Sequence, residues 1–279
     1  MNRIAALIVL MTLALYPKLH CVVSIPPLKT FVDMIGDTEV SSTVMVPPGH
    51  SPHSYEPKPS QMRSLEKADC YFAVGVEFEK AWLPRFTSQN PRMKIVDLSK
   101  GIKKYPVTGS SQSDSEHLDP HIWTSPENVE KMLGGIYRTL VALDPKNRDL
   151  FENNYRKLLK KIEATDHRIK KLLAPLPPQS AFMVFHPSWG YFAREYGLRQ
   201  LPVEIEGKAP KPRQLIRLID KARQEKVRAI FVQPEFSDKS ARLLASELGI
   251  PVVKISPLAP DWCANLLRLA EAIAKGAPK

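Results

Sequence analysis

Apolar and polar positions follow two alternating patterns along the first part of the chain. Short β-branched runs that predict strands cover residues 22–25, 40–46, 70–74 and 95–98, and periodic segments that predict helices cover 28–35 and 60–67. Strands that alternate with helices are typical of an α/β lobe with a largely parallel sheet. We therefore expect such a lobe over residues 21–143.

A long amphipathic stretch follows this lobe. Its apolar positions recur at alternating spacings of four and three from Phe151 to Leu172, with Asp144 as a plausible cap and Pro145 at the first helical position. At 1.5 Å per residue, a helix over 144–175 is about 45 Å long, more than one lobe needs. The pattern predicts a helix that connects two lobes.

Strand and helix patterns resume after the proline-rich segment 174–178. The predicted strands are 181–185, 201–205, 229–232 and 252–255, and the predicted helices are 190–196, 213–224, 239–248 and a last one from about residue 261. The fold class is therefore α/β, with two Rossmann-like lobes at 21–143 and 176–279 joined by the backbone helix 144–175.

Composition and charge narrow the function classes. The 279 residues are 43% hydrophobic and 25% charged, which excludes a disordered chain and a polytopic membrane protein. The formal net charge of +11 would suit a nucleic-acid partner. However, the basic residues lie at helical spacing in 157–171 and 213–223 without interleaved aromatic residues, so we interpret them as solvated helix faces and expect no nucleic-acid binding.

The amino terminus reads as a secretory signal peptide over residues 1–20. Arg3 is followed by an apolar run from Ile4 to Tyr16, which is shorter than the roughly 20 residues a membrane-spanning helix needs. A lipid anchor at Cys21 stays open, although the residues before it make a poor lipobox. The other cysteines are Cys70 and Cys263, and the sequence does not choose a disulfide pair among the three.

Three of the seven histidines stand at or just after predicted strand ends. His53 lies in a proline-rich loop, His121 lies in Asp-Pro-His-Ile-Trp, and His186 follows the strand 181–185. An α/β sheet presents its binding crevice at these ends, so the three imidazoles can meet in a site assembled by tertiary structure. Three neutral nitrogen ligands that leave one position open suit zinc.

The motifs around these histidines resemble a known family over nearly the whole mature chain. They are Val23–Pro27, Pro48–Pro57, Lys67–Asp69, Asp119–Trp123, Phe185–Phe192 and Gln233–Ser237. In this order, with a long helix between the second and third histidine, they resemble the zinc and manganese receptors of bacterial ABC importers, the cluster that includes ZnuA and TroA. The resemblance implies two lobes around one buried metal, and a periplasmic, monomeric receptor that delivers the ion to a membrane permease.

By this resemblance the ligands are His53, His121 and His186, whereas His50 in the same loop is a neighbour. Manganese-selective relatives tend to place a carboxylate where His186 stands, so the histidine favours zinc, with manganese as the alternative. Segment 109–117 corresponds to a His-rich loop in many zinc relatives, but here His117 is its only histidine.

The fourth ligand departs from the family pattern. Many members carry an aspartate where this chain has Ser256, which is a poor zinc ligand. We name Glu235, at a strand end that should face the same crevice, as a substitute ligand. A solvated or histidine-bonded glutamate, or a water molecule in the fourth position, remains an equal alternative.

Two other function classes fit parts of the pattern. Three histidines with an open position also describe a zinc hydrolase, but no HExxH or comparable pair supplies a general base, and Glu235 alone could act as one. A surface adhesin is compatible with the fold. We expect a zinc receptor rather than an enzyme.

Overall fold

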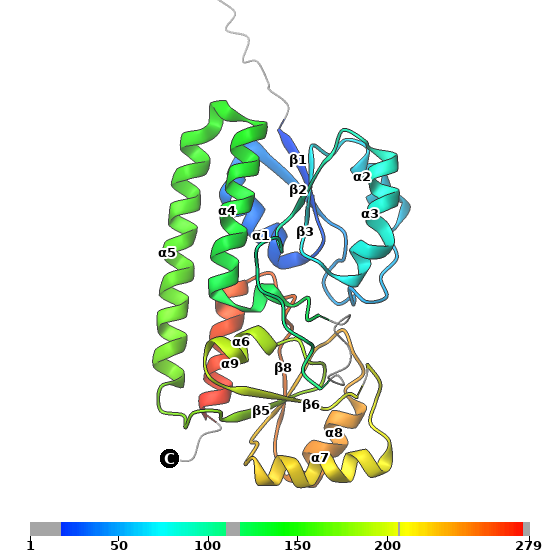
Figure 1. The fold of residues 1–279 in the computed structure, drawn as a ribbon, viewed down its shortest axis with the longest axis vertical. Helices are drawn as coiled ribbons and strands as arrows, with labels where there is room; N and C mark the ends of the chain where they lie inside the picture. The colour runs from blue at the N-terminus through cyan, green and yellow to red at the C-terminus, as the bar shows by residue number, and fades with distance from the viewer. Residues whose placement is uncertain (1–17, 110–117, 206, 276–279) are drawn as a thin grey trace, which may run out of the picture.

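The computed structural model describes residues 18–109, 118–205 and 207–275. Two α/β lobes are stacked along the long axis, and two long helices run along one side of the first lobe (Figure 1). Each lobe contains a sheet of four parallel strands. The predicted fold class is confirmed.

The first sheet has the strand order β2-β1-β3-β4. Its elements, in chain order, are β1 (Leu19–Val23), α1 (Pro26–Gly36), the 3-10 turn η1 (Asp37–Glu39), β2 (Val40–Val44), α2 (Pro59–Leu65), β3 (Cys70–Ala73), α3 (Glu77–Gln89) and β4 (Lys94–Asp97). β3 is buried at every position, as a central parallel strand covered on both faces should be. β4 forms the edge of the sheet, and most of its residues are exposed.

The second sheet has the order β6-β5-β7-β8. Its elements are β5 (Ala181–Val184), α6 (Gly190–Glu195), β6 (Arg199–Pro202), α7 (Pro212–Gln224), β7 (Ile230–Val232), α8 (Lys239–Leu248), β8 (Val252–Lys254) and α9 (Trp262–Lys275). In both sheets the first strand of the lobe lies inside the sheet with a partner on each side. The loops that leave its carboxyl end therefore start at the middle of the lobe.

Helices α4 (Pro126–Leu143) and α5 (Arg148–Leu173) connect the two lobes. The predicted helix over 144–175 is shorter at its start, because Pro145–Asn147 forms the separate 3-10 turn η3. The predicted apolar stripe is buried at Phe151, Leu158 and Ile162, among others. The boundaries of the three segments at residues 143 and 175 remain a prediction.

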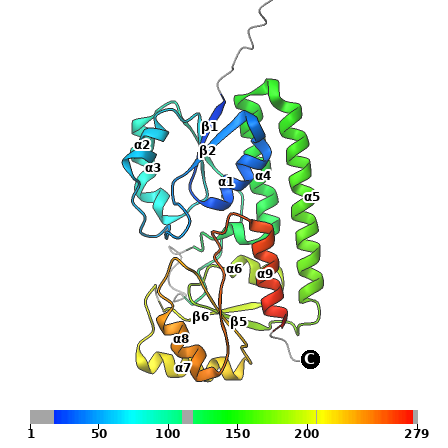
Figure 2. The ribbon, with the colours of Figure 1, turned by 180° about the vertical axis from the view of Figure 1, so that it is seen from behind.

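The last helix, α9, follows the second sheet in the chain but packs against a helix that connects the lobes. It packs along α5 (Figure 2), and Trp262 at its start meets Phe31 of α1 edge-on, with ring centroids 5.9 Å apart. The Trp262 indole also donates a hydrogen bond to the carbonyl of Trp123, at 2.6 Å, and the Trp123 indole donates to the carbonyl of Pro257, at 2.9 Å. These contacts tie the second lobe to the first beside the site.

The first strand begins earlier than predicted. β1 starts at Leu19 rather than Val22, because Leu19 and His20 pair in register with Val40 and Ser41 of β2. The NH of His20 also bonds the Asp69 carboxylate at 2.8 Å, and its carbonyl accepts from the Asp69 NH at 2.8 Å. A signal boundary after residue 20 would cut this strand. Residues 1–17, which hold most of the predicted signal peptide, lie outside the described part. Among the described helices, none has the length and apolar character to cross a membrane.

Candidate metal centre

The three predicted histidines come from three separate loops. His53 lies in a turn between β2 and α2, and His121 stands directly before the 3-10 turn η2 (Ile122–Thr124) that leads into α4. His186 follows β5 in the second lobe, where its backbone NH and carbonyl are both bonded by the side chain of Gln233. His121 and His186 thus stand at the ends of regular elements, whereas His53 is placed by the turn that contains it.

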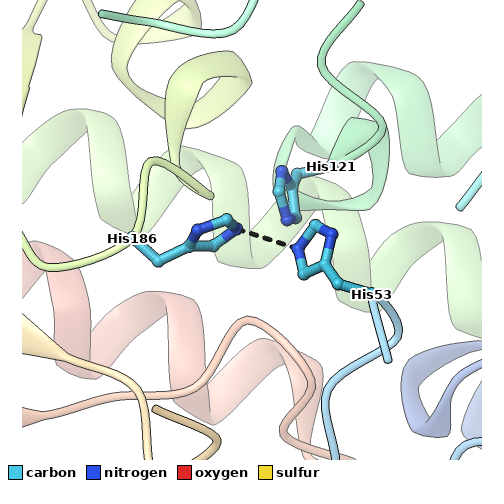
Figure 3. A group of neighbouring side chains, drawn as sticks. All are labelled: His53, His121 and His186. Atoms are coloured by element: carbon cyan, nitrogen blue, oxygen red, sulfur yellow. Dashed lines mark hydrogen bonds between the residues drawn. The ribbon is translucent and has the colours of Figure 1, made fainter. Parts of the chain in front are cut away.

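The structure brings the three imidazoles together. Figure 3 shows the rings pointing toward a common point, with one ligand atom from each lying within 4.8 Å of the others. The Nε2 atoms of His53 and His186 are 3.2 Å apart. Two nitrogens bound to one tetrahedral zinc at about 2.0–2.1 Å are separated by roughly 3.3 Å. The observed separation is therefore close to the edge of a zinc tetrahedron.

A carboxylate contacts the second nitrogen of each ring. Nδ1 of His121 lies 2.7 Å from Asp119 Oδ1, and Nδ1 of His186 lies 2.7 Å from Glu204 Oε1. Nδ1 of His53 lies 3.1 Å from the carboxylate of Glu77. An Nδ1–H that donates to a carboxylate leaves Nε2 as the lone-pair donor, which is the arrangement found in histidine metal sites.

This arrangement leaves two lone pairs facing each other. When Glu77 and Glu204 hold the Nδ1 protons of His53 and His186, both Nε2 atoms are acceptors at 3.2 Å. Only a proton or a cation between them turns this repulsion into attraction. The donor set therefore fits a cation, and neutral nitrogen ligands suit a borderline ion such as zinc.

The environment shifts the pKa values of two rings in opposite directions. Burial lowers the pKa of His186, with partial compensation from its hydrogen bond to Glu204. Burial also lowers the pKa of His53, but the bond to Glu77 and the charge of Glu77 outweigh it, so the pKa of His53 is raised. Burial raises the pKa of Glu77, yet the hydrogen bond and charge of His53 bring it down to about 2. The Glu77 carboxylate is therefore charged at neutral pH.

The histidines line a small cavity between the lobes. Its volume is about 20 Å³, enough for one ion or one water molecule. Trp123 lines it beside His121, with ring centroids 5.2 Å apart, and Phe236 stacks on the His186 ring at 4.7 Å. His186 is 9% exposed and His121 is 6% exposed, whereas His53 is the outermost of the three. Two of the three rings are therefore buried, and His53 is the exposed one.

Glu235 lines the same cavity but does not belong to the three-histidine cluster. Its Oε1 accepts a hydrogen bond from Ser256 at 2.6 Å. Its Oε2 is buried and has no hydrogen-bond partner among the residues that the structure describes. The predicted fourth ligand thus lines the same cavity as the three histidines, with one carboxylate oxygen that bonds no other described residue.

Other residues lie around the centre or away from it. His50 is exposed, and its ring meets Tyr55 edge-on at 5.3 Å, apart from the cluster. Tyr191 donates to the carbonyl of Asp119 at 2.8 Å, and Asp261 accepts from the NH of Ala264 at the start of α9. His117 lies outside the described residues.

Glu77 and Glu204 are site residues that the sequence interpretation missed. Glu77 follows β3 at the start of α3, and Glu204 follows β6, so both stand at the carboxyl ends of strands. β6 is next to β5, which precedes His186, whereas β1 lies between β3 and β2, which precedes the His53 loop. The position of Glu77 and Glu204 at a strand end was the sequence signal that could have identified them as site residues. Asp119 accepts a hydrogen bond from the NH of His121 at 2.9 Å and also bonds the ring.

Known proteins of similar sequence and structure are metal receptors by name. The high-affinity zinc uptake system protein ZnuA of Bacillus subtilis is 28% identical over 246 residues, which cover 83% of this chain and 76% of that protein. The manganese ABC transporter substrate-binding lipoprotein PsaA of Streptococcus pneumoniae is 27% identical over 247 residues, covering 84% of this chain and 78% of that protein. A crystal structure of ZnuA superposes with a TM-score of 0.87 at 40% identity, covering 92% of this chain and 98% of that one.

The sequence model of one family matches almost the whole described chain. The family is described as zinc-uptake complex component A, periplasmic, and the match runs over residues 21–276. Together with the geometry of the centre and the ZnuA-like fold, it confirms the resemblance inferred from the sequence motifs. The chain belongs to the family of the periplasmic zinc-uptake component ZnuA.

Proposed function

We propose that this protein is an extracytoplasmic receptor that binds one Zn²⁺ ion and delivers it to the permease of an ABC importer. The convergence of three Nε2 atoms, each with its ring held by a carboxylate, is the observation that carries the proposal. The names of the relatives, which include zinc and manganese receptors, support metal transport in general.

The donor set favours zinc over manganese. The three clustered ligands are all imidazole nitrogens, whereas Mn²⁺ is better served by carboxylate and water oxygens. We therefore expect the metal-free protein to select zinc when both ions are offered. The decisive experiment is a competition titration with zinc and manganese, with bound metal counted per chain. One zinc per chain and no retained manganese would support the assignment, and retention of manganese would overturn it.

We assign the fourth coordination position to Glu235. The assignment rests on the buried Oε2 atom without a partner on the cavity wall, and on Ser256, which holds the other oxygen. Glu235→Gln removes the charge and keeps the volume, so zinc affinity should fall at least tenfold. Glu225→Gln is the matched control. Glu225 forms an ion pair with Arg199 at 2.5 Å, and it does not line the cavity. An unchanged affinity for Glu235→Gln would leave water as the fourth ligand.

A receptor fits the centre better than a hydrolase. The cavity of about 20 Å³ that the histidines line matches the size of one ion or one water molecule. Glu77, Asp119 and Glu204 each bond a histidine ring, so none of them is available as a general base, and Glu235 is assigned to the fourth coordination position. In the receptor these carboxylates orient the ligands, and the ion is cargo. We expect the loaded protein to act as a monomer with one site, which sedimentation of the zinc-bound chain would test.

A further inference from the structure

Two of the three cysteines meet in the core of the first lobe. Cys21 is the middle residue of β1, and Cys70 is the first residue of β3. The two strands are neighbours, and the two cysteines are paired in register. Both side chains are 0% exposed, and their Sγ atoms are 3.1 Å apart. Cys263 lies in α9, and no contact between it and another thiol is seen in the described part of the chain.

The backbone geometry is compatible with a covalent bond between them. Neighbouring strands lie about 4.7–4.9 Å apart, which falls within the range of about 4.4–6.8 Å between the Cα atoms of disulfide-bonded cysteines. The Sγ atoms, at 3.1 Å, need to approach by about 1 Å to reach the bond length of about 2.05 Å. Side-chain rotation can supply this movement without shifting the strands.

The position of Cys21 argues against a lipid anchor. A lipidated cysteine is the first residue of the mature chain, and its sulfur carries the lipid. Here the two preceding residues, Leu19 and His20, belong to β1, and the His20 ring bonds Ser41 and Ser64 at 3.0 and 2.8 Å. Because the Cys21 sulfur is fully buried beside Cys70, it has no path to a membrane.

We propose that Cys21 and Cys70 form an intramolecular disulfide that ties β1 to β3. The inference relies on the extracytoplasmic location in the proposed function, because such bonds persist in oxidising compartments. It extends beyond that function, since the pair lies in the sheet core and is not part of the metal centre. Burial of both sulfurs means that the bond forms while the lobe folds, before the strands are covered.

The oxidant is a disulfide-bearing thiol oxidant, either glutathione disulfide or an oxidoreductase. The thiolate of one cysteine attacks the disulfide of the oxidant, which forms a mixed disulfide and releases the first oxidant thiol. The thiolate of the other cysteine then attacks the protein sulfur, the Cys21–Cys70 bond forms, and the second oxidant thiol leaves. Two protein thiols are oxidised and one oxidant disulfide is reduced, and the two protons pass to the departing thiolates.

The bond would brace the part of the lobe that carries His53. Cys21 and Cys70 are 49 residues apart, and the closed loop contains α1, β2, the His53 turn and α2. Closing such a loop restricts the unfolded chain. Reduction of the pair should therefore lower the thermal unfolding midpoint of the metal-free protein by roughly 5–15 °C.

The test counts thiols in the full chain. The protein is unfolded with reductant, refolded in a mixture of oxidised and reduced glutathione, then denatured and alkylated for intact-mass and peptide analysis. We expect one alkylated thiol, at Cys263, and a linked pair of peptides that contain Cys21 and Cys70. Before alkylation, the refolded protein should be lighter than the fully reduced protein by two hydrogen atoms. Three alkylated thiols, or glutathione bound to Cys21 or Cys70, would overturn the proposal. The same thiol count is made on protein that was expressed with its amino-terminal segment and exported. A lipid on Cys21 in that protein would overturn the proposal.

Single variants provide matched controls. Cys263→Ala should retain the disulfide and show no alkylated thiol, whereas Cys21→Ala and Cys70→Ala should each show two. Zinc stoichiometry is measured on the same samples, and the double variant Cys21→Ala/Cys70→Ala should still bind one zinc. A disulfide-bonded chain that binds no metal would refute the proposed function alone. A zinc-binding chain with three free thiols would refute the disulfide alone.

Discussion

The Glu204 carboxylate, which bonds Nδ1 of His186, offers a quantitative test of how a nearby charge changes the zinc affinity. Glu204 is 7% exposed and lies 2.7 Å from Nδ1 of His186, and the ring is 9% exposed. Glu204→Gln keeps an oxygen that can accept a hydrogen bond from Nδ1–H of His186 but removes the negative charge. The variant therefore separates the charge of the carboxylate from its role in orienting the ring.

The magnitude follows from the distances. From the Glu204 oxygen through Nδ1 and across the ring to an ion on Nε2 is about 7 Å, so at an effective dielectric constant of about 20 the attraction between one carboxylate charge and a doubly charged ion is roughly 4.7 kcal/mol. Loss of the whole of that attraction corresponds to about 3,000-fold weaker zinc binding. The 10–100-fold loss typical of carboxylates that hold metal-binding histidines sets the lower end of the expected range.

The assay is a competition of metal-free protein with a chromogenic zinc chelator at about pH 7.5. Glu225→Gln is the control, because it removes one charge from an ion pair with Arg199 and leaves the centre intact. Circular dichroism checks that both variants fold. An affinity for Glu204→Gln within twofold of the unaltered protein would refute the electrostatic role of this carboxylate.

Three further expectations follow from the same geometry. His121→Ala should weaken zinc binding at least 100-fold, while His50→Ala, in the exposed part of the His53 loop, should leave it unchanged in the same titration; equal effects would contradict the assigned ligand set. Zinc affinity should fall as pH drops through 6.5, beginning with protonation of His53, whose pKa is raised, whereas His186, whose pKa is lowered, accepts a proton later; a flat titration between pH 5 and 8 would exclude histidine ligation. Trp262→Phe removes the bond to the Trp123 carbonyl and should lower the unfolding midpoint in calorimetry by about 2–4 °C, since a buried hydrogen bond is worth about 1 kcal/mol; no shift would show that this contact does not stabilise the lobe junction.

Sequence patterns predicted the parts of the fold with strong periodicity. The stripe from Phe151 to Ile169 identified α5, and the apolar runs identified the parallel strands. The interpretation passed over α3, which contains Pro84, and α4, which contains Gly134 and Gly135, because these residues interrupt a helical pattern. In the structure, tertiary packing of both helices overrides that local cost.

The candidate centre was predicted only as far as local motifs reach. His53, His121 and His186 stand in distinctive loops, so their convergence could be foreseen. Glu77 and Glu204 contact the rings of His53 and His186 because the parallel sheets gather the carboxyl ends of β3 and β2, and of β6 and β5, at one edge of each sheet. That pairing is a property of the folded sheets and has no signature in the spacing of residues. The early start of β1 is similar, since it depends on pairing with Val40 and Ser41 of β2.

Zinc K-edge X-ray absorption of the protein loaded with one equivalent of zinc tests the central claim most directly. The account predicts three imidazole nitrogens and one oxygen at about 2.0–2.1 Å. The imidazole signal should decrease by one ligand in each of His53→Ala, His121→Ala and His186→Ala and stay complete in His50→Ala. A sulfur shell, a six-oxygen shell, or an imidazole signal unchanged by those three substitutions would contradict it.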